Sequence, residues 1–282
     1  MIIRAGYRIA FDCPAPTPML LKLSVCQERR GDLLTSDRVH VSGGLPTSQH
    51  IDEFGNLVTR LDAPAGPVEF SADFLIADSG QPDVQNWSAR QIPVGDLPPE
   101  ALPFLLGSRY CETDLMSGLA WSLFGGVPEG WARVQAIVEY AHKRISFGYP
   151  HARPTRTAKE GHDEQVGVCR DYAHLAVTLC RAMNIPARYC NGYLGDIGVP
   201  ASDAPMDFCA WFEVYLEGGW HTFDARHNAP RMGRVVIARG RDAADVAMTH
   251  SFGASYLQNF TVICEDVTDA KAASAPQLVA AE

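Results

Sequence analysis

The chain has 282 residues, of which 46% are hydrophobic and 20% are charged, and its formal net charge is -9. This length and composition allow a sizeable buried core and are typical of a soluble enzyme built from one large domain and a smaller one. The negative charge argues against nucleic acid or an anionic membrane surface as a partner, because both favour clustered Lys and Arg.

Targeting and cofactor signals are weak in this sequence. Residues 1–8 lack the long apolar core of a signal peptide, and no later run is long enough to span a bilayer, so we expect a cytoplasmic protein. The eight cysteines are scattered, so we expect most of them to be reduced core residues. No CxxC, HExxH, GxSxG, Walker or dinucleotide-binding motif is present, so we expect no metal and no cofactor.

The first hundred residues read as β-structure. Short runs alternate apolar and polar residues and are separated by Gly, Pro, Asn and Asp, at 7–11, 19–25, 57–61 and 68–76. This pattern predicts an antiparallel sandwich or meander, so we expect an N-terminal β-rich domain over 1–95. The Pro-rich stretch at 92–103 is the predicted boundary, with a second domain over 100–267 and a disordered tail over 268–282.

The second domain is predicted to mix helices and strands. Helices are expected at 114–124 and 131–145, and a third from Cys169 to about Asn184, each with apolar residues at helical spacing. Strands are expected at 187–194, 209–216, 220–224, 234–239 and 260–267, with a short helix at 242–247. The fold class is therefore α+β.

Cys169 is the candidate nucleophile. It lies in the first turn of the predicted helix, where free N–H groups and the helix dipole favour a thiolate. Gly167 removes a side chain just before it, which would let a substrate carbonyl approach. A cysteine in such a place is commonly a small buried hydrophobe, and only the flanking glycine and the following strands favour a catalytic role.

Those strands form a predicted hairpin that carries the remaining candidates. Because side chains alternate along a strand, Cys209 and Trp211 share one face of the first strand, and Asp224 lies on the matching face of the second. A base on one strand and an orienting carboxylate on the next require this parity. Trp211 is expected in the core or in the wall of the cleft, where it would stack on substrate.

Three motifs in this order resemble the bacterial transglutaminase-like superfamily of papain-related cysteine peptidases and amidases. They are Gly167-Val168-Cys169-Arg170-Asp171-Tyr172-Ala173-His174, Cys209-Ala210-Trp211-Phe212-Glu213-Val214-Tyr215 and Gly219-Trp220-His221-Thr222-Phe223-Asp224-Ala225. The resemblance implies a papain/transglutaminase-like core, a helix bundle packed on an antiparallel sheet, preceded by a β-sandwich-like domain. It also implies that Cys169 is the nucleophile, Asp224 the orienting carboxylate and position 209 the base, where this chain has cysteine instead of histidine.

Three histidines are candidates to replace the missing base. His227 follows the second strand, in a loop that could fold back toward both Asp224 and Cys169, although a solvated loop histidine is the plainer interpretation. His221 is expected on the opposite face of the strand. His174, five residues beyond Cys169 on its helix, is expected to make structural hydrogen bonds.

The sequence leaves three functions open. The first is a cysteine hydrolase or acyltransferase that cleaves amide bonds of a peptide, protein or isopeptide substrate through a Cys169 thioester, slowly because the base is missing. The alternative is a catalytically inactive peptide-binding or scaffolding module that retains the cleft. The third is a redox pair or zinc site of Cys169 and Cys209 with His227 and Asp224. The substrate, the acyl acceptor and the oligomeric state do not follow from the sequence.

Overall fold

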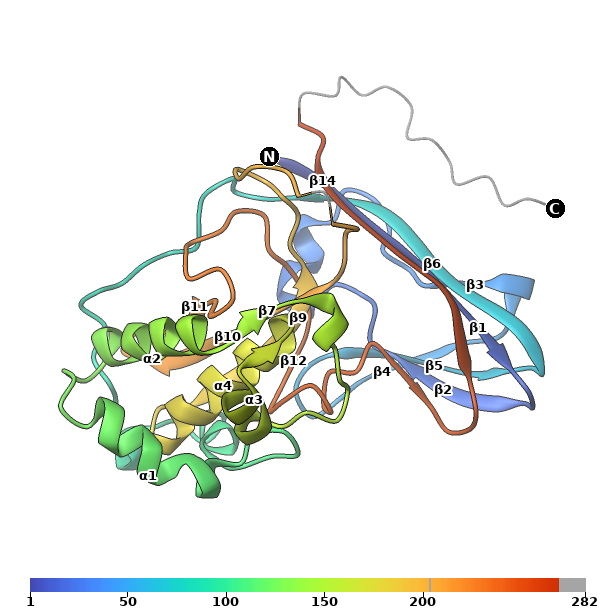
Figure 1. The fold of residues 1–282 in the computed structure, drawn as a ribbon. Helices are drawn as coiled ribbons and strands as arrows, with labels where there is room; N and C mark the ends of the chain where they lie inside the picture. Colours follow the sequence, from blue (N-terminus) through green and yellow to red (C-terminus); the bar gives the residue numbers. More distant parts are fainter. Residues whose placement is uncertain (203, 269–282) are drawn as a thin grey trace.

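The computed structural model describes residues 1–202 and 204–268, and this part of the chain contains four α-helices and three four-stranded sheets (Figure 1). The helices are α1 (Thr113–Phe124), α2 (Trp131–Arg144), α3 (Ala158–Glu164) and α4 (Cys169–Ala182). Among the described residues, no helix combines the length and the apolar character needed to cross a membrane.

Two of the sheets form the β-rich region. One has the order β14 (Tyr256–Asp266), β1 (Ile2–Cys13), β6 (Gly66–Ala77), β3 (His40–Val41). The other has the order β13 (Thr249–Ser251), β2 (Thr17–Leu21), β5 (Leu57–Ala63), β4 (Ser48–Ile51). Alternate residues of β6 are buried, and Phe70 and Phe74 share one apolar core with Met19 and Leu61 of the other sheet. The predicted N-terminal β-structure is therefore confirmed.

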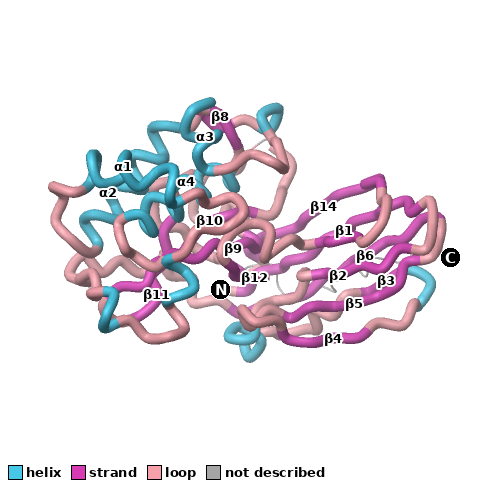
Figure 2. Tube along the Cα trace, turned by 90° about the horizontal axis from the view of Figure 1, so that it is seen from below, coloured by secondary structure: helices cyan, strands magenta, loops and turns pink. Residues whose placement is uncertain are grey.

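The third sheet carries the helical layer. Its order is β11 (Gly219–Phe223), β10 (Cys209–Leu216), β9 (Ala187–Tyr193), β12 (Val235–Gly240). Helix α4 packs on β10 and β9, and α1, α2 and α3 pack around α4. Figure 2 shows these helices on one side of the molecule and the long strands of the β-rich region on the other. The predicted α+β core, helices on an antiparallel sheet, is confirmed.

Helix α4 is buried more completely than its periodicity indicates. The apolar spacing predicts one buried face, yet every residue from Asp171 to Ala182 is buried. The cause is that the sheet covers one side of α4 and three helices cover the others. A buried helix holds its first residue, Cys169, in a fixed position, as a catalytic group requires.

The predicted helix at 242–247 is wrong, because these residues form turns. The Asp242 carboxylate accepts hydrogen bonds from the backbone N–H of Ala244 at 2.9 Å and of Tyr110 at 2.8 Å. A side chain that binds nearby backbone donors in this way favours a turn over a helix.

The end of the chain returns to the β-rich region. The final strand, predicted to be part of the second domain, is β14, and it pairs antiparallel with β1, while β13 pairs with β2. The last strands therefore complete the two N-terminal sheets. The division of the chain at residues 95 to 100 stays a prediction, and the predicted tail lies, apart from Thr268, outside the described residues.

Candidate active site

The backbone just before α4 is held by two short strands. β7 (Ser146–Phe147) and β8 (Val166–Gly167) pair in parallel, and the N–H of Gly148 donates to the carbonyl of Gly167 at 3.0 Å. One residue later, the N–H of Val168 donates to the Asp171 carboxylate at 2.8 Å. These contacts start the helix at Cys169, where first-turn N–H groups lack intrahelical acceptors and the dipole is positive.

Gly167 has a packing role in this arrangement. A Cβ atom at this position would lie 2.6 Å from both Cβ and a carboxylate oxygen of Asp171. The buried Asp171 in turn binds Arg156 at 3.2 Å. The missing side chain of Gly167 therefore makes room for the carboxylate that caps α4, and the expected contact of Gly167 with substrate receives no support from this geometry.

Cys169 is the accessible thiol of the chain. All eight cysteines lie within the described residues as free thiols, seven of them buried and Cys169 partly exposed. Cys169 packs against the cluster that contains Cys209 and Trp211. The sequence prediction that positions 169 and 209 meet is thus realised as two neighbouring thiols.

The environment makes the two thiols unequal. Contact with the Cys209 thiol lowers the pKa of Cys169, and the backbone of Ala210 and the charge of Arg226 act in the same direction against the effect of burial. The pKa of Cys209 is raised well above its ordinary value, first by the contact with Cys169 and then by burial. Cys169 therefore ionises first and Cys209 keeps its proton, which leaves Cys209 able to donate to a thiolate. In the structure the Cys209 thiol lies 3.7 Å from the carbonyl oxygen of Ala210.

Asp224 is a buried and fully engaged carboxylate at the end of β11. One oxygen accepts the N–H groups of Arg226 at 3.0 Å and His227 at 2.9 Å, and the other accepts His227 Nδ1 at 2.8 Å and Arg234 Nη2 at 2.8 Å. Burial alone would raise its pKa, but the Arg234 charge and the His227 contacts outweigh burial, so the pKa of Asp224 is held below its ordinary value. Asp224 stays ionised and holds the loop that follows it.

His227 reaches only one of its two expected partners. Its Nδ1 contacts Asp224, as predicted, while its Nε2 lies 2.8 Å from Arg226 Nη1. Since a guanidinium can only donate, Nε2 accepts, and this hydrogen-bond network assigns the proton to Nδ1. The nitrogen that would face Cys169 in a triad is occupied by Arg226.

Cys169 opens into a cavity of about 150 Å³. Its described lining includes Cys209, Arg226, Asp207, Phe147 and Tyr149. The Arg226 guanidinium lies 4.0 Å from the centre of the Phe147 ring, which fixes it at the cavity wall.

Gly167, Trp211 and His227 are not among the described residues that line this cavity. Trp211 is 1% exposed and lies beneath Arg234, whose guanidinium is 4.9 Å from the ring centre. Of its two expected places, Trp211 therefore occupies the core, and stacking on substrate receives no support from its position.

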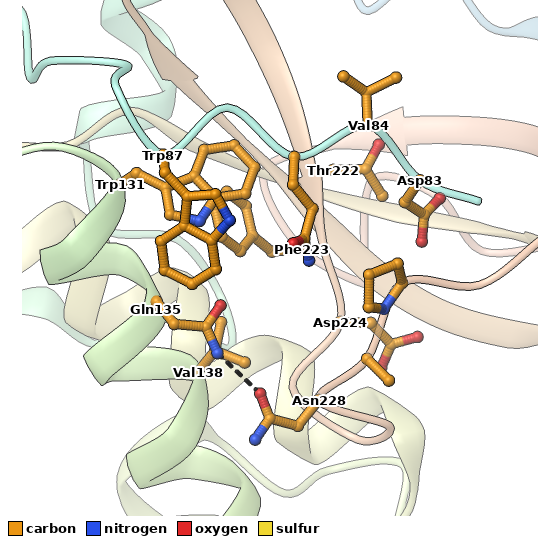
Figure 3. A pocket seen from close by; sticks show the side chains of 13 residues that line it. Asp83, Val84, Trp87, Trp131, Gln135, Val138, Thr222, Phe223, Asp224 and Asn228 are labelled. Atoms are coloured by element: carbon orange, nitrogen blue, oxygen red, sulfur yellow. Dashed lines mark hydrogen bonds between the residues drawn. The ribbon is translucent and has the colours of Figure 1, made fainter. Parts of the chain in front are cut away.

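A second cavity, of about 210 Å³, is lined by Asp224 (Figure 3). Trp87, Trp131 and Phe223 form its aromatic wall, and Gln135 donates to Asn228 at 2.9 Å across it. Asp224 therefore lies between the loop that carries His227 and a separate, aromatic cavity.

Arg226 and Asp207 are site residues that sequence reasoning missed. Phe212 pairs with Phe223, so extending this register places Cys209 opposite position 226, but the spacing of the motifs alone does not give the register. Asp207 lies two residues before Cys209, where an extended backbone places both side chains on one side. It precedes the strand predicted at 209–216, so the alternation within that strand does not include it.

The other two histidines serve structure. His174 is fully buried, accepts the N–H of Ala243 at Nε2 at 3.1 Å, and has its pKa lowered well below the ordinary value by burial. His221 pairs with Val214, and its Nε2 lies 3.0 Å from the Glu217 carbonyl oxygen. Within the part of the chain that the structure describes, no three His, Cys, Asp or Glu side chains are grouped so that they could hold a metal ion.

Comparison with known proteins places this geometry in a family. Residues 119–225 match the sequence model of the transglutaminase-like superfamily. An uncharacterised protein of Mycobacterium leprae is 25% identical over 224 residues, 75% of this chain and 77% of that protein. An uncharacterised protein of Mycobacterium tuberculosis is 31% identical over 116 residues, 36% of this chain and 37% of that protein.

A solved structure matches nearly the whole chain. The crystal structure of a candidate cysteine protease from Cytophaga hutchinsonii is 30% identical, with a TM-score of 0.80, and the match covers 94% of this chain and 90% of that one. The match includes the β-rich region as well as the helical core. The chain therefore belongs to the transglutaminase-like superfamily, as the three motifs indicated.

Proposed function

We propose that this protein is a cysteine hydrolase or acyltransferase that acts on amide bonds of peptides or proteins through a thioester on Cys169. The observation that carries the proposal is the position of Cys169: it is the partly exposed thiol among eight, at the N-terminus of a buried helix, beside the Cys209 donor in a cavity. Each of these features favours a reactive thiolate. The superfamily membership supports the same chemistry.

In the proposed reaction the Cys169 sulfur attacks the carbonyl carbon of the substrate, and the carbonyl oxygen takes up negative charge. The first N–H groups of α4, those of Cys169 and Arg170, would stabilise the oxyanion. The C–N bond then breaks, the amine leaves with a proton, and water or a second amine resolves the thioester. Cys209 donates its S–H to the thiolate in the resting state and is not a base, because its pKa is raised.

Asp224 and His227 act through Arg226 in this proposal. Asp224 accepts the backbone N–H of Arg226, and His227 accepts from its guanidinium, so the pair holds Arg226 at the cavity wall. The Arg226 charge lowers the pKa of Cys169. The triad is thus atypical: its carboxylate and histidine position a cation that stabilises the thiolate.

One observation favours the alternative, a catalytically inactive peptide-binding module with the same cleft. The base position holds a thiol with a raised pKa, and His227 Nε2 is occupied by Arg226. Neither group accepts a proton from Cys169. Under the alternative, Cys169 has an ordinary pKa and peptide binding survives its replacement by alanine.

The test is capture of the acyl-enzyme. The protein is incubated with a 4-nitrophenyl ester and with a thioester of a short acylated peptide, and intact mass is measured, with Cys169→Ala as the control. We expect a mass increase equal to the acyl group in the native protein and none in the variant. No acylation, together with an alkylation pKa of Cys169 near the free-thiol value of about 8.5, would establish the alternative.

A cytoplasmic location remains part of the proposal. It is supported by the eight free thiols, since structural disulfides are common in oxidising compartments and rare in the cytosol.

A further inference from the structure

The cavity beside Cys169 contains a carboxyl group that the mechanism above does not use. Asp207 lines the same 150 Å³ cavity as Cys169, Cys209 and Arg226. It lies two residues before Cys209 and is half-buried. A carboxyl group that shares a small cavity with a nucleophilic thiol is a candidate for proton-transfer chemistry.

Four of the charged or titratable groups that share the cavity with Asp207 come from four different elements. They are Arg226 from the loop after β11, Tyr149 from a 3-10 turn at Tyr149–His151, Cys169 at the start of α4 and Cys209 at the start of β10. Burial raises the pKa of Asp207, and the Phe208 backbone and the Arg226 charge oppose it. Negative charge on Asp207 raises the pKa of Cys169, so the two groups compete for one proton.

We propose that Asp207 is the proton-transfer residue of the Cys169 reaction and does the work of the imidazole that position 209 lacks. This inference rests on the function proposed above and adds a catalytic residue to it. The geometry that carries it is the placement of the Asp207 carboxyl group, the nucleophilic Cys169 thiol and the fixed Arg226 cation in a single small cavity.

Asp207 supplies the proton that the leaving nitrogen needs and takes one back from water. Because Cys169 is the thiolate and Asp207 competes for the same proton, Asp207 holds that proton as the sulfur bonds to the carbonyl carbon. When the C–N bond breaks, the nitrogen takes this proton and leaves as a neutral amine, so the thioester forms beside an ionised Asp207. In deacylation, water gives a proton to Asp207 while its oxygen bonds to the carbon, and the Cys169 sulfur departs as the thiolate, which restores the starting state.

The other titratable groups of the described lining suit this role less well. Burial raises the pKa of Tyr149, so it holds its proton, and Arg226 cannot be deprotonated. Asp196 accepts the backbone N–H of Ser202 at 2.7 Å, a contact within its own loop. Asp207 lies in the cavity, and its pKa is raised while the pKa of Cys169 is lowered. These opposite shifts bring the proton affinities of the carboxyl group and the thiol closer together.

The test compares two substrates that share an acyl group and differ in the leaving group. A 4-nitrophenyl ester releases a phenolate that needs no proton, whereas the matching 4-nitroanilide needs one. In Asp207→Asn we expect anilide turnover to fall by about 10²–10⁴-fold, while ester acylation stays within about tenfold and Cys169 alkylation by iodoacetamide is retained. Asp207→Glu should recover part of the anilide turnover, and the exposed Asp96→Asn should change neither rate.

The outcomes separate this inference from the function on which it rests. Anilide turnover within threefold of native in Asp207→Asn, or equal losses with ester and anilide, overturns the role of Asp207 and leaves the Cys169 thioester standing. No acyl-enzyme from the native protein with either substrate overturns both. If Asp207→Asn does not fold, as judged by circular dichroism, Asp207→Ser takes its place with the same expected ratio between the two substrates.

Discussion

Replacing Cys209 by alanine is expected to raise the pKa of Cys169. The contact with the Cys209 thiol is the first of the effects that lower this pKa. A hydrogen bond to a charged group contributes about 1.5–3 kcal/mol, and a thiol is a weak donor, so we take the lower end of that range. One pKa unit corresponds to about 1.4 kcal/mol, and we therefore expect an upward shift of about one unit in Cys209→Ala.

The assay is the rate of Cys169 alkylation by iodoacetamide as a function of pH, resolved by peptide mass spectrometry. Below both pKa values the thiolate fraction, and with it the rate, should fall about tenfold in Cys209→Ala. The matched control is Cys190→Ala, because Cys190 is a fully buried thiol of the same cluster that is absent from the causes of the Cys169 shift. This control should leave the alkylation profile in place.

An unchanged or lower pKa of Cys169 in Cys209→Ala would refute the reasoning. It would mean that the second thiol does not donate to the thiolate, and that the helix terminus and Arg226 alone set the reactivity of Cys169. A shift of equal size in Cys190→Ala would point to general loosening of the cluster and would refute it as well.

Three further predictions concern stability, each measured by urea denaturation. Gly167→Ala should destabilise the fold by about 1–3 kcal/mol, because its Cβ would lie 2.6 Å from Asp171. Gly118 is exposed on α1, and a Cβ there would meet no atom, so Gly118→Ala should stabilise the fold by about 0.5–1 kcal/mol. Asp224→Asn weakens the charged hydrogen bond to the buried Arg234, which keeps Asp83 as a second partner, and should cost about 1.5–3 kcal/mol. Glu217→Gln breaks only an exposed ion pair and should cost under about 1 kcal/mol. The pKa of Asp224 is lower in the folded protein than in the unfolded chain, so its ionised form stabilises the fold above the ordinary carboxyl pKa. This stabilisation is lost as the pH falls through the pKa of the folded state. The free energies of unfolding of the native protein and of Asp224→Asn should therefore converge in acid. Equal changes in stability for Gly167→Ala and Gly118→Ala would contradict the first prediction, and equal costs for Asp224→Asn and Glu217→Gln would contradict the second. The third would be contradicted if the native protein stayed more stable than Asp224→Asn in strong acid.

The sequence was most informative where the pattern is local. The strand predicted at 209–216 is β10 with the same bounds, and the helix predicted at 114–124 is α1 with one added residue. The parity of the hairpin is also confirmed, since Glu213 pairs with Thr222 and Tyr215 with Trp220. Alternation and helical spacing depend only on neighbouring residues, so a sequence reveals them without knowledge of the remaining fold.

The site was less predictable because its contacts join distant segments. Motif order indicated that positions 169 and 209 would meet, but the reason for Gly167 lies in the carboxylate of Asp171, which folds back on it. The loop after β11 could not be placed from spacing, so the sequence could not show that Arg226, and not His227, faces the cavity. The pairing of β14 with β1 left no local signal, because strand partners far apart in sequence are set by tertiary packing.

That pairing has a consequence for how the protein is made. The register joins Ile3 to Asp266, so β1 leaves the ribosome long before the strand with which it pairs is synthesised. Until β14 is synthesised, one edge of β1 has no partner in its native sheet, and unpaired edges invite association with other chains. Closing so long a loop also slows folding. A chain truncated before Tyr256 should therefore aggregate instead of yielding an isolated catalytic core, and screening for activity needs the whole sequence.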